Sequence, residues 1–255
     1  ALQLRERWRL GGELKARRYD HAIVLPNTWK SALVPFFADI PLRSGYVGES
    51  RYGLLNLTYR KSGAPTMLHY ARLSEAPGKE VRQPLPPPRL DAAAAQIEAT
   101  QSAFGLAGRY AVLCPGAEYG PAKRWPYFRE LAGRLPLPAV ILGSGNDAEA
   151  ARGIPGKNLV GQTSLDQAID LLAGAELVVS NDSGLMHVAA ALRRPQVALF
   201  GSSSPEHTPP LSAAARVLWL RLECSPCFAR ECPLGHFRCM RDISVQQVLS
   251  ELERL

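Results

Sequence analysis

The stretch VVSNDSGLMHVAAAL, residues 178–192, joins an apolar run directly to the start of an amphipathic helix. The apolar face of that helix has the i, i+3, i+4, i+7 spacing, with Leu185, Val188, Ala189 and Leu192. A buried strand followed at once by such a helix is the unit from which parallel, helix-covered sheets are built. The stretch therefore predicts an α/β fold, in which ligands bind beyond the carboxyl ends of the strands.

The alternation of strands and helices continues over most of the chain. Strands that are apolar throughout are predicted at residues 110–114, 139–142, 158–160, 177–180, 197–200 and 217–220. Helices are predicted to begin at Pro126 and to span residues 147–152, 165–173, 184–192 and 245–255. Continuous apolar strands separated by helices indicate a parallel sheet covered on both faces.

A smaller part of the chain precedes this region and has the same pattern. One β-α-β step is predicted there, with its strand, helix and strand at residues 22–25, 31–37 and 45–47. The segment SEAPGKEVRQPLPPPRLD, residues 74–91, is rich in proline and lacks apolar periodicity, which is typical of a stiff linker. We therefore expect two domains, residues 1–90 and residues 91–255.

The composition is that of an ordinary globular protein, with 255 residues, 46% of them hydrophobic and 21% charged. No apolar run reaches the ~18 residues that a membrane-spanning helix needs, and the chain does not open on a signal peptide. We expect a cytoplasmic protein.

The positive charge is unevenly distributed. Residues 1–90 contain fifteen Lys or Arg and seven Asp or Glu, whereas residues 91–255 contain fifteen and sixteen. A basic excess confined to the first domain favours an anionic partner there, such as nucleic acid, a phosphorylated lipid or a membrane surface. A solvated basic face is the alternative.

Three loops at the predicted carboxyl ends of strands contain residues suited to a phosphate ligand. The first, CPGAEYGPAKRWP at residues 114–126, contains Gly116 and Gly120 and places Lys123 before a helix that begins at Pro126. A cation in a glycine-containing loop near a helix N-terminus is one way in which proteins bind phosphate. An ordinary surface loop with one lysine fits the same pattern.

The second loop is ILGSGNDAEAAR, residues 141–152, which contains Gly143 and Gly145. Asp147 or Glu149 could accept hydrogen bonds from ribose hydroxyls, as the acidic residue of nucleotide-binding folds does. For either residue taken alone, helix capping is the better explanation and needs no ligand.

The third loop is the stretch quoted first. Asp182 or Ser183 could cap the helix, but Gly184 costs helix stability and leaves the backbone amides open to an anion. His187, in the first turn, would face the same anion. Together with Lys123, these residues fit a pyrophosphate group.

Four of the five cysteines lie in CSPCFARECPLGHFRC, an insertion at residues 224–239. Cys224, Cys227, Cys232 and Cys239 begin with a C-x2-C pair, which in a reducing compartment favours a metal over disulfides. A structural zinc with four thiolate ligands would hold together a loop that has few apolar residues. Reduced thiols and a disulfide are the alternatives.

The motifs PGAEYGPAKRWP, SNDSGLMHVAAAL and FGSSSPEHTPPL, with LPNTWKSALVPFFADIPLRSGYVGESRYGLLN upstream, resemble the bacterial ADP-heptose:lipopolysaccharide heptosyltransferases of glycosyltransferase family 9. The likeness is greatest to the heptosyltransferase II group of Gram-negative bacteria and runs along nearly the whole chain. It implies the GT-B architecture, in which two Rossmann-like domains bind the acceptor and the sugar nucleotide respectively.

The resemblance also implies an inverting transfer of heptose from ADP-heptose to the phosphorylated, Kdo-bearing inner core of lipid A, without a catalytic metal. By match to the family motifs, Lys123 would stabilise the leaving phosphate, and Ser183, Gly184 and His187 would contact the diphosphate. Asp182 would hold the turn or touch the donor sugar. For the adenosine, Asp147 is preferred to Glu149.

The chain departs from the family pattern at its start, where ALQLRERWRLGGELKARRYD reads as a helix from the middle of a domain. The family begins with a strand and a Gly-rich loop that contains the Asp expected to act as general base. We assign no residue to that role and expect this chain to bind ADP-heptose but to transfer it poorly. Lys30, Arg43 and Arg51 match family loops and are candidates for the acceptor's phosphates or carboxylates, at the cytoplasmic face of the inner membrane.

Two other functions fit parts of the sequence. A sugar-nucleotide epimerase of similar architecture would also hold a nucleotide at a Ser-Gly helix end, but it would not need a basic acceptor domain. A zinc-stabilised nucleic-acid binder would need its positive charge and stacking aromatic residues around the cysteines. No basic excess like that of residues 1–90 surrounds the cysteines, so we expect no nucleic-acid partner for a cysteine-based module.

Overall fold

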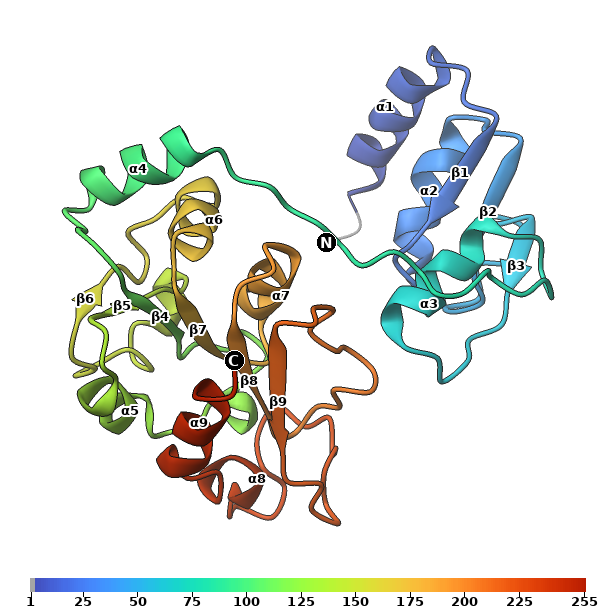
Figure 1. The fold of residues 1–255 in the computed structure, drawn as a ribbon. Helices are drawn as coiled ribbons and strands as arrows, with labels where there is room; N and C mark the ends of the chain where they lie inside the picture. Colours follow the sequence, from blue (N-terminus) through green and yellow to red (C-terminus); the bar gives the residue numbers. More distant parts are fainter. Residues whose placement is uncertain (1–2) are drawn as a thin grey trace. The chain divides into compact units, whose positions relative to one another are not determined.

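The computed structural model describes residues 3–255, which form two compact units. Unit 1 ends at Leu85, and unit 2 spans Pro86–Leu255. The division falls within the proline-rich segment at residues 74–91, most of which has neither helix nor strand. Figure 1 shows an α/β arrangement in each unit.

Unit 1 is a three-stranded parallel sheet with the strand order β1-β2-β3 and helices packed against it. Its elements are α1 (Leu4–Lys15), β1 (His21–Val24), α2 (Trp29–Phe37), β2 (Leu42–Tyr46), β3 (Leu57–Tyr59), α3 (Thr66–Ala71) and the short 3-10 helix η1 (Arg72–Ser74). Helices α1 and α2 pack closely at Gly11, where a Cβ atom would lie 2.6 Å from the Cβ of Phe37. A larger residue at Gly11 would force the two helices apart.

Unit 2 contains a six-stranded parallel sheet between two layers of helices (Figure 1). The elements of its first half are α4 (Ala94–Ala103), β4 (Ala111–Cys114), η2 (Pro121–Lys123), α5 (Phe128–Arg134), β5 (Ala139–Ile141), η3 (Gly145–Asp147) and β6 (Lys157–Asn158). Those of its second half are α6 (Leu165–Ala173), β7 (Leu177–Asn181), α7 (Gly184–Ala191), β8 (Gln196–Phe200), β9 (Ala215–Trp219), α8 (Arg238–Arg241) and α9 (Val245–Leu252).

The strand order in unit 2 is β6-β5-β4-β7-β8-β9. The chain therefore builds one half of the sheet outward from β4, then returns to the centre and builds the other half outward from β7. Strands β4 and β7 are neighbours in this sheet, with Cys114 paired to Ser180 at their carboxyl ends. Such a reversal point is where open α/β sheets bind their ligands.

The core of unit 2 follows the alternation of side chains along the central strands. Val112 and Val178 point to the face covered by α6 and α7, in a cluster with Leu171 and Ala189. The next residues along the strands, such as Leu113, belong to the opposite cluster with α5 and α9. Because both faces are buried, these strands are apolar throughout, as the sequence predicts.

The predicted helix at residues 147–152 is wrong. The chain instead forms the short 3-10 helix η3, followed by turns. Asp147 accepts hydrogen bonds from the backbone N and the Oγ of Ser144, at 2.9 and 2.8 Å. This reciprocal capping closes a single tight turn rather than starting a longer helix.

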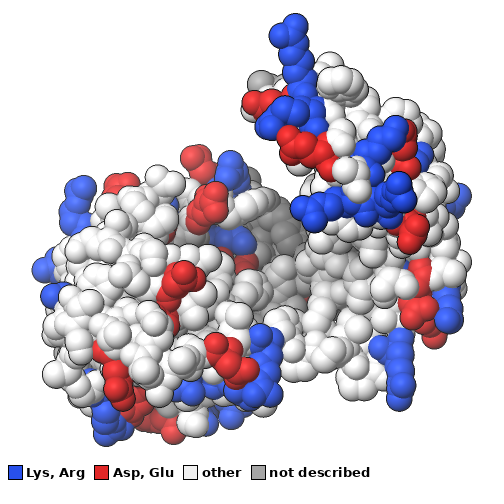
Figure 2. All heavy atoms as spheres, turned by 90° about the horizontal axis from the view of Figure 1, so that it is seen from above, with Lys and Arg blue, Asp and Glu red and all other residues white. Residues whose placement is uncertain are grey.

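Figure 2 shows Lys and Arg side chains interspersed with Asp and Glu on the visible face of both units. The basic excess of residues 1–90 is therefore one of number and not a separate patch in this view. Within the described part of the chain, no helix is both long enough and apolar enough to cross a bilayer.

Candidate functional site

A cavity of about 470 Å³ opens at the reversal point of the sheet in unit 2. It is lined from the loops after β4 and β5 and from the first turns of α6 and α7, including Gly116, Gly143, Ser164 and Gly184. The N-termini of two helices therefore meet one cavity, and their unpaired backbone N–H groups favour a negatively charged ligand.

Asn181, at the end of β7, fixes the position of the loop after β4. Its Oδ1 accepts a hydrogen bond from the backbone N of Trp125 at 3.1 Å, and its Nδ2 donates to the carbonyl of Pro115 at 2.7 Å. The side chain is fully buried, so these bonds are shielded from water. Sequence analysis missed this role, because the partners lie more than fifty residues away in the chain.

Lys123 and Asp182 form a largely buried ion pair, with Lys123 Nζ 2.5 Å from Asp182 Oδ2. The same carboxylate oxygen accepts a hydrogen bond from Ser203 Oγ at 2.5 Å. The ammonium group also lies over the ring of Tyr119, 4.9 Å from its centroid. The structure thus brings two of the predicted site residues into contact and gives the lysine a fixed position.

The N-terminus of α7 is left open. Ser183 occupies the N-cap position, yet its side chain makes no capping hydrogen bond and instead lies 3.2 Å from Ser180 Oγ. Asp182 is engaged with Lys123 rather than with the helix. A Cβ built on Gly184 would have no heavy atom within 4 Å. Capping therefore does not account for this turn, and the space in front of its amides is accessible to a ligand.

His187 lies one turn further along α7, within electrostatic range of both charged partners. Its side chain is exposed, but the surrounding protein still desolvates the ring enough to lower the pKa of the imidazole. The negative charge of Asp182 opposes this change, and the positive charge of Lys123 adds to it. The neutral imidazole is therefore favoured in the free protein.

The two acidic candidates in the loop after β5 have different environments. Asp147 lines the cavity and caps η3 through Oδ2, while its Oδ1 is buried with no hydrogen-bond partner in the described chain. Glu149 is exposed and does not line the cavity. Glu118, in the loop after β4, lines the cavity with an exposed carboxylate. It lies within the motif PGAEYGPAKRWP but was not among the predicted site residues.

The acceptor candidates in unit 1 are mostly engaged within the protein. Arg51 is 2% exposed, and its guanidinium donates to the backbone carbonyls of Pro26 and Tyr46. Arg43 donates to the carbonyls of Leu54 and Ile40, at 2.7 and 2.6 Å. Both side chains therefore hold loops of unit 1 in place.

Lys30 is partly exposed and forms no ion pair with a described residue. Unit 1 also contains a cavity of about 810 Å³ at the carboxyl ends of β2 and β3. Arg60, Arg72 and Lys79 line it together with the acidic Glu80, and Lys79 forms an ion pair with Glu75 at 3.2 Å. The three cationic residues lie outside the family motifs and were therefore not predicted.

The four clustered cysteines are free thiols. Residues 3–255 contain no group of three or more His, Cys, Asp or Glu side chains arranged to hold a metal ion. The thiols are nevertheless near one another, since Cys224, Cys227 and Cys232 all contribute to a pKa of about 11 for Cys239, after the larger effect of burial. Cys232 accepts a hydrogen bond from the backbone N of Phe237 at 3.4 Å, and such bonds lower the pKa of its thiol.

The sequence of this chain is similar to one family of known proteins along most of its length. The model of glycosyltransferase family 9 (heptosyltransferase) matches residues 7–238. Lipopolysaccharide heptosyltransferase 2 of Escherichia coli K12 is 44% identical over 280 aligned positions, which cover 100% of this chain and 80% of the relative. Lipooligosaccharide heptosyltransferase 2 of Haemophilus influenzae is 42% identical over 246, which cover 86% of this chain and 71% of the relative.

The solved structure of E. coli ADP-heptose lipopolysaccharide heptosyltransferase II has the same fold. It superposes with a TM-score of 0.88 at 42% identity, over 99% of this chain and 81% of that one. The predicted α/β fold of GT-B type with parallel sheets is confirmed. On the family match and these relatives, the chain belongs to glycosyltransferase family 9, the heptosyltransferases.

Proposed function

We propose that this protein transfers L-glycero-D-manno-heptose from ADP-heptose to the heptosyl-Kdo2-lipid A inner core of lipopolysaccharide. The observation that carries the proposal is the open N-terminus of α7 beside Lys123, at the point where an α/β sheet binds nucleotides. The names of the relatives, lipopolysaccharide and lipooligosaccharide heptosyltransferases, agree with this chemistry.

The diphosphate of the donor is placed at the first turn of α7. The free amides at Ser183 and Gly184 would bind its oxygens, and Lys123 would approach from the loop after β4. When the diphosphate binds, His187 would form a hydrogen bond with it, and the negative charge of the phosphates would favour the protonated imidazole. Asp182 keeps Lys123 in place and is close enough to the same turn to contact the donor sugar.

The adenosine is placed in the cavity next to this turn. Asp147 and Glu118 are the carboxylates that line it, and either could accept a hydrogen bond from a ribose hydroxyl. Asp147 is held rigidly by Ser144, whereas Glu118 is exposed and free to reorient. Glu149 is the weaker candidate, because its side chain lies outside the cavity.

The chemical step would be an inverting displacement without a catalytic metal. An acceptor hydroxyl attacks the anomeric carbon of the heptose, the bond from that carbon to the diphosphate oxygen breaks, and ADP leaves with the electron pair. Negative charge therefore grows at the diphosphate, where Lys123 and the α7 amides stabilise it. No described residue is assigned as the general base that takes the hydroxyl proton.

The acceptor is placed on unit 1, which carries the basic excess. Lys30 remains a candidate, and Arg60 is a further one, because it lines the cavity of unit 1 and forms no ion pair with a described residue. Lys79 in the same cavity pairs with Glu75, and Arg43 and Arg51 are engaged with backbone carbonyls. An acceptor embedded in lipid would bring the protein to the cytoplasmic face of the inner membrane, as a peripheral protein.

A structural zinc at Cys224, Cys227, Cys232 and Cys239 is a separate proposal. The supporting observation is the C-x2-C spacing, together with the placement of Cys224, Cys227 and Cys232 close enough to Cys239 to raise the pKa of its thiol, after the larger effect of burial. In the described chain no three of these side chains are arranged to hold a metal ion, so zinc binding would require the cysteine side chains to rearrange. Metal analysis of protein purified without chelator should find zinc near one equivalent, and a value near zero would remove this proposal.

The proposed activity is tested by incubating the protein with ADP-heptose and heptosyl-Kdo2-lipid A and following ADP release and product mass. Transfer to the lipid acceptor is expected, at a low rate if a base is lacking. An epimerase would convert the sugar nucleotide without acceptor, and a nucleic-acid binder would leave both substrates unchanged. Either of these results would contradict the proposal.

A further inference from the structure

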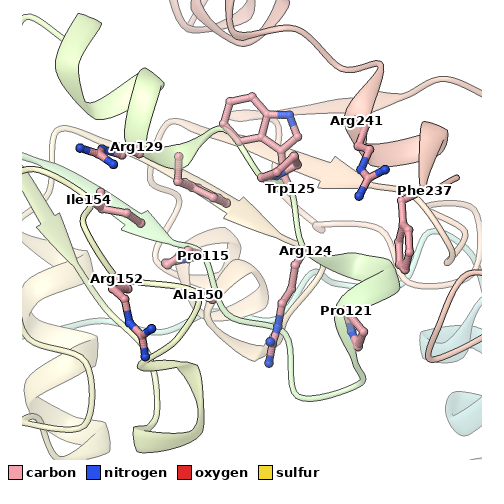
Figure 3. Close-up of a pocket in the computed structure, with 12 residues that line it drawn as sticks. Pro115, Pro121, Arg124, Trp125, Arg129, Ala150, Arg152, Ile154, Phe237 and Arg241 are labelled. Carbon is pink, nitrogen blue, oxygen red and sulfur yellow. The ribbon is translucent and has the colours of Figure 1, made fainter. Parts of the chain in front are cut away.

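A second cavity lies beside the loop that carries Lys123, next to the start of α5 (Figure 3). Its volume of about 310 Å³ is at the lower end for pockets that hold small molecules. Four arginines line it, Arg124, Arg129, Arg152 and Arg241, and no Asp or Glu does. We call it the arginine pocket.

The arginines come from four separate segments of unit 2. Arg124 follows η2, Arg129 lies on α5, Arg152 follows η3, and Arg241 ends α8. In Figure 3 the guanidinium groups of Arg124 and Arg152 extend in the same direction, and that of Arg241 extends toward the loop that holds Arg124. In the same view, Ile154 lies between Arg129 and Arg152.

These guanidinium groups lack acidic partners. None of the four forms an ion pair with a carboxylate in the described residues, although many exposed arginines of this chain do. Arg124 Nε is buried without a hydrogen-bond partner in the described chain. Two acids next in the chain to lining arginines pair with other residues, Asp242 with Arg238 at 2.9 Å and Glu130 with Arg134 at 3.5 Å.

Positive charges that line one cavity without counter-charges repel one another, and a bound anion would lower that cost. The planar guanidinium fork matches the geometry of phosphate oxygens, which it binds through two parallel hydrogen bonds. Trp125, Phe128 and Phe237 form an aromatic part of the wall beside the arginines.

We propose that the arginine pocket is a second anion site of unit 2, which binds a phosphate or diphosphate group. It is distinct from the donor cavity, because the two share no lining residue. The phosphate chemistry could be presented by a soluble diphosphate or by the headgroup of an anionic lipid. The proposal does not depend on the sugar donor.

The test is titration of inorganic pyrophosphate into the protein at fixed ionic strength, with the donor cavity saturated by ADP. Calorimetry should detect about one pyrophosphate per chain, and Arg152→Gln/Arg241→Gln should weaken binding about tenfold or more, since each charge-assisted bond is lost. Both side chains are exposed, so the fold should tolerate the change.

The matched control is Arg109→Gln/Arg216→Gln, which removes the same charge from exposed sites elsewhere in unit 2. It should bind pyrophosphate like the original protein. Equal binding by all three proteins, or loss of pyrophosphate binding when ADP is present, would overturn the proposal. If ADP itself does not bind, the same titration without ADP still compares the variants.

Sedimentation with phosphatidylglycerol vesicles distinguishes the two sources of phosphate. Weaker vesicle binding by Arg152→Gln/Arg241→Gln than by the control assigns the site to a lipid headgroup. Unchanged vesicle binding, together with weaker pyrophosphate binding, assigns it to a soluble diphosphate. No effect of the variant in either experiment contradicts the site.

Discussion

Lys123 Nζ lies 2.5 Å from Asp182 Oδ2, and this pair joins the loop after β4 to the loop after β7 across the centre of the sheet. The side chains are 16% and 6% exposed, so the ammonium is held in one place before any ligand arrives. A fixed cation needs no reorganisation when charge develops on a leaving diphosphate, which is the condition for strong electrostatic stabilisation.

Lys123→Met is predicted to lower the rate of heptose transfer by about a hundredfold or more, because one preorganised charge is lost. It should also lower the free energy of unfolding by about 3 kcal/mol, since Asp182 is left buried without its partner. Lys123→Met/Asp182→Asn should recover much of the stability but not the rate. Lys157→Met, at an exposed site, is the control. A rate near the original for Lys123→Met would exclude the proposed role.

Asn181→Ala is predicted to lower the free energy of unfolding by about 3 kcal/mol, because it leaves the Trp125 amide and the Pro115 carbonyl buried and unpaired. Urea denaturation measures this change. Asn146→Ala, at an exposed position, should stay within about 0.5 kcal/mol of the original. If the two variants are equally stable, Asn181 does not hold the loop.

Two glycines of the donor cavity should respond differently to alanine. A Cβ at Gly116 would lie 2.1 Å from Asp147 Cγ, so Gly116→Ala should destabilise the fold. Gly184→Ala has open space and should fold normally, yet weaken ADP binding about tenfold, or 1.4 kcal/mol, by placing a methyl group before the α7 amides. Unchanged ADP affinity in Gly184→Ala would argue against a diphosphate at this turn.

The pH dependence of stability should include a contribution from His187. Its pKa in the folded chain is lowered, chiefly by desolvation, so unfolded chains bind the proton more readily. The contribution of the neutral ring to the free energy of unfolding is fully present above the pKa of the unfolded chain, about 6.5. It is lost as the pH falls from there through the lower pKa of the folded chain. Urea denaturation over this pH range should show that the free energy of unfolding depends less on pH in His187→Asn than in the original protein.

ADP should raise the pKa of His187, because the phosphates add negative charge beside the ring. Binding at a pH between the free and bound values should therefore take up protons. Calorimetry in buffers of different ionisation enthalpy measures that uptake. No proton uptake in the original protein, or equal uptake in His187→Asn, would show that His187 does not lie beside the bound diphosphate.

The thiols should differ in reactivity after chelator treatment. Backbone hydrogen bonds, the first from Phe237, lower the pKa of Cys232, whereas burial raises the pKa of Cys114 to about 12 and that of Cys239 to about 11. Since the thiolate is the reactive form, Cys232 should react fastest with a disulfide reagent at pH 8. Cys232→Ser should remove the fast phase and Cys114→Ser should not. A fast phase that survives Cys232→Ser would contradict this order.

The sequence predicted the elements whose signals are local. Helix α6 begins and ends where expected, at Leu165 and Ala173, because Ser164 and Gln167 form a capping box before a strongly amphipathic segment. The helix expected from Asp147 failed because its carboxylate turns back to Ser144. Local patterns cannot distinguish a cap that starts a long helix from one that closes a single turn.

The contacts that assemble the site could not be predicted from the sequence. Lys123 and Asp182 were both candidates, but their pairing depends on β4 and β7 becoming neighbours in the sheet. Asn181 and Glu118 lie within motifs shared with the family, but the groups that each of them faces follow from the same topology. Arg51 matched a family loop by sequence, yet its burial is set by carbonyl groups from two other segments.

The central claim is that the open end of α7 and Lys123 bind the diphosphate of an ADP-sugar. Thermal unfolding with ADP or with UDP at equal concentration tests it most directly, in the original protein and in Lys123→Met. The account predicts that ADP raises the melting temperature of the original protein clearly more than UDP does, and that Lys123→Met loses most of this shift. No shift with either nucleotide, or an equal ADP shift in both proteins, would contradict it.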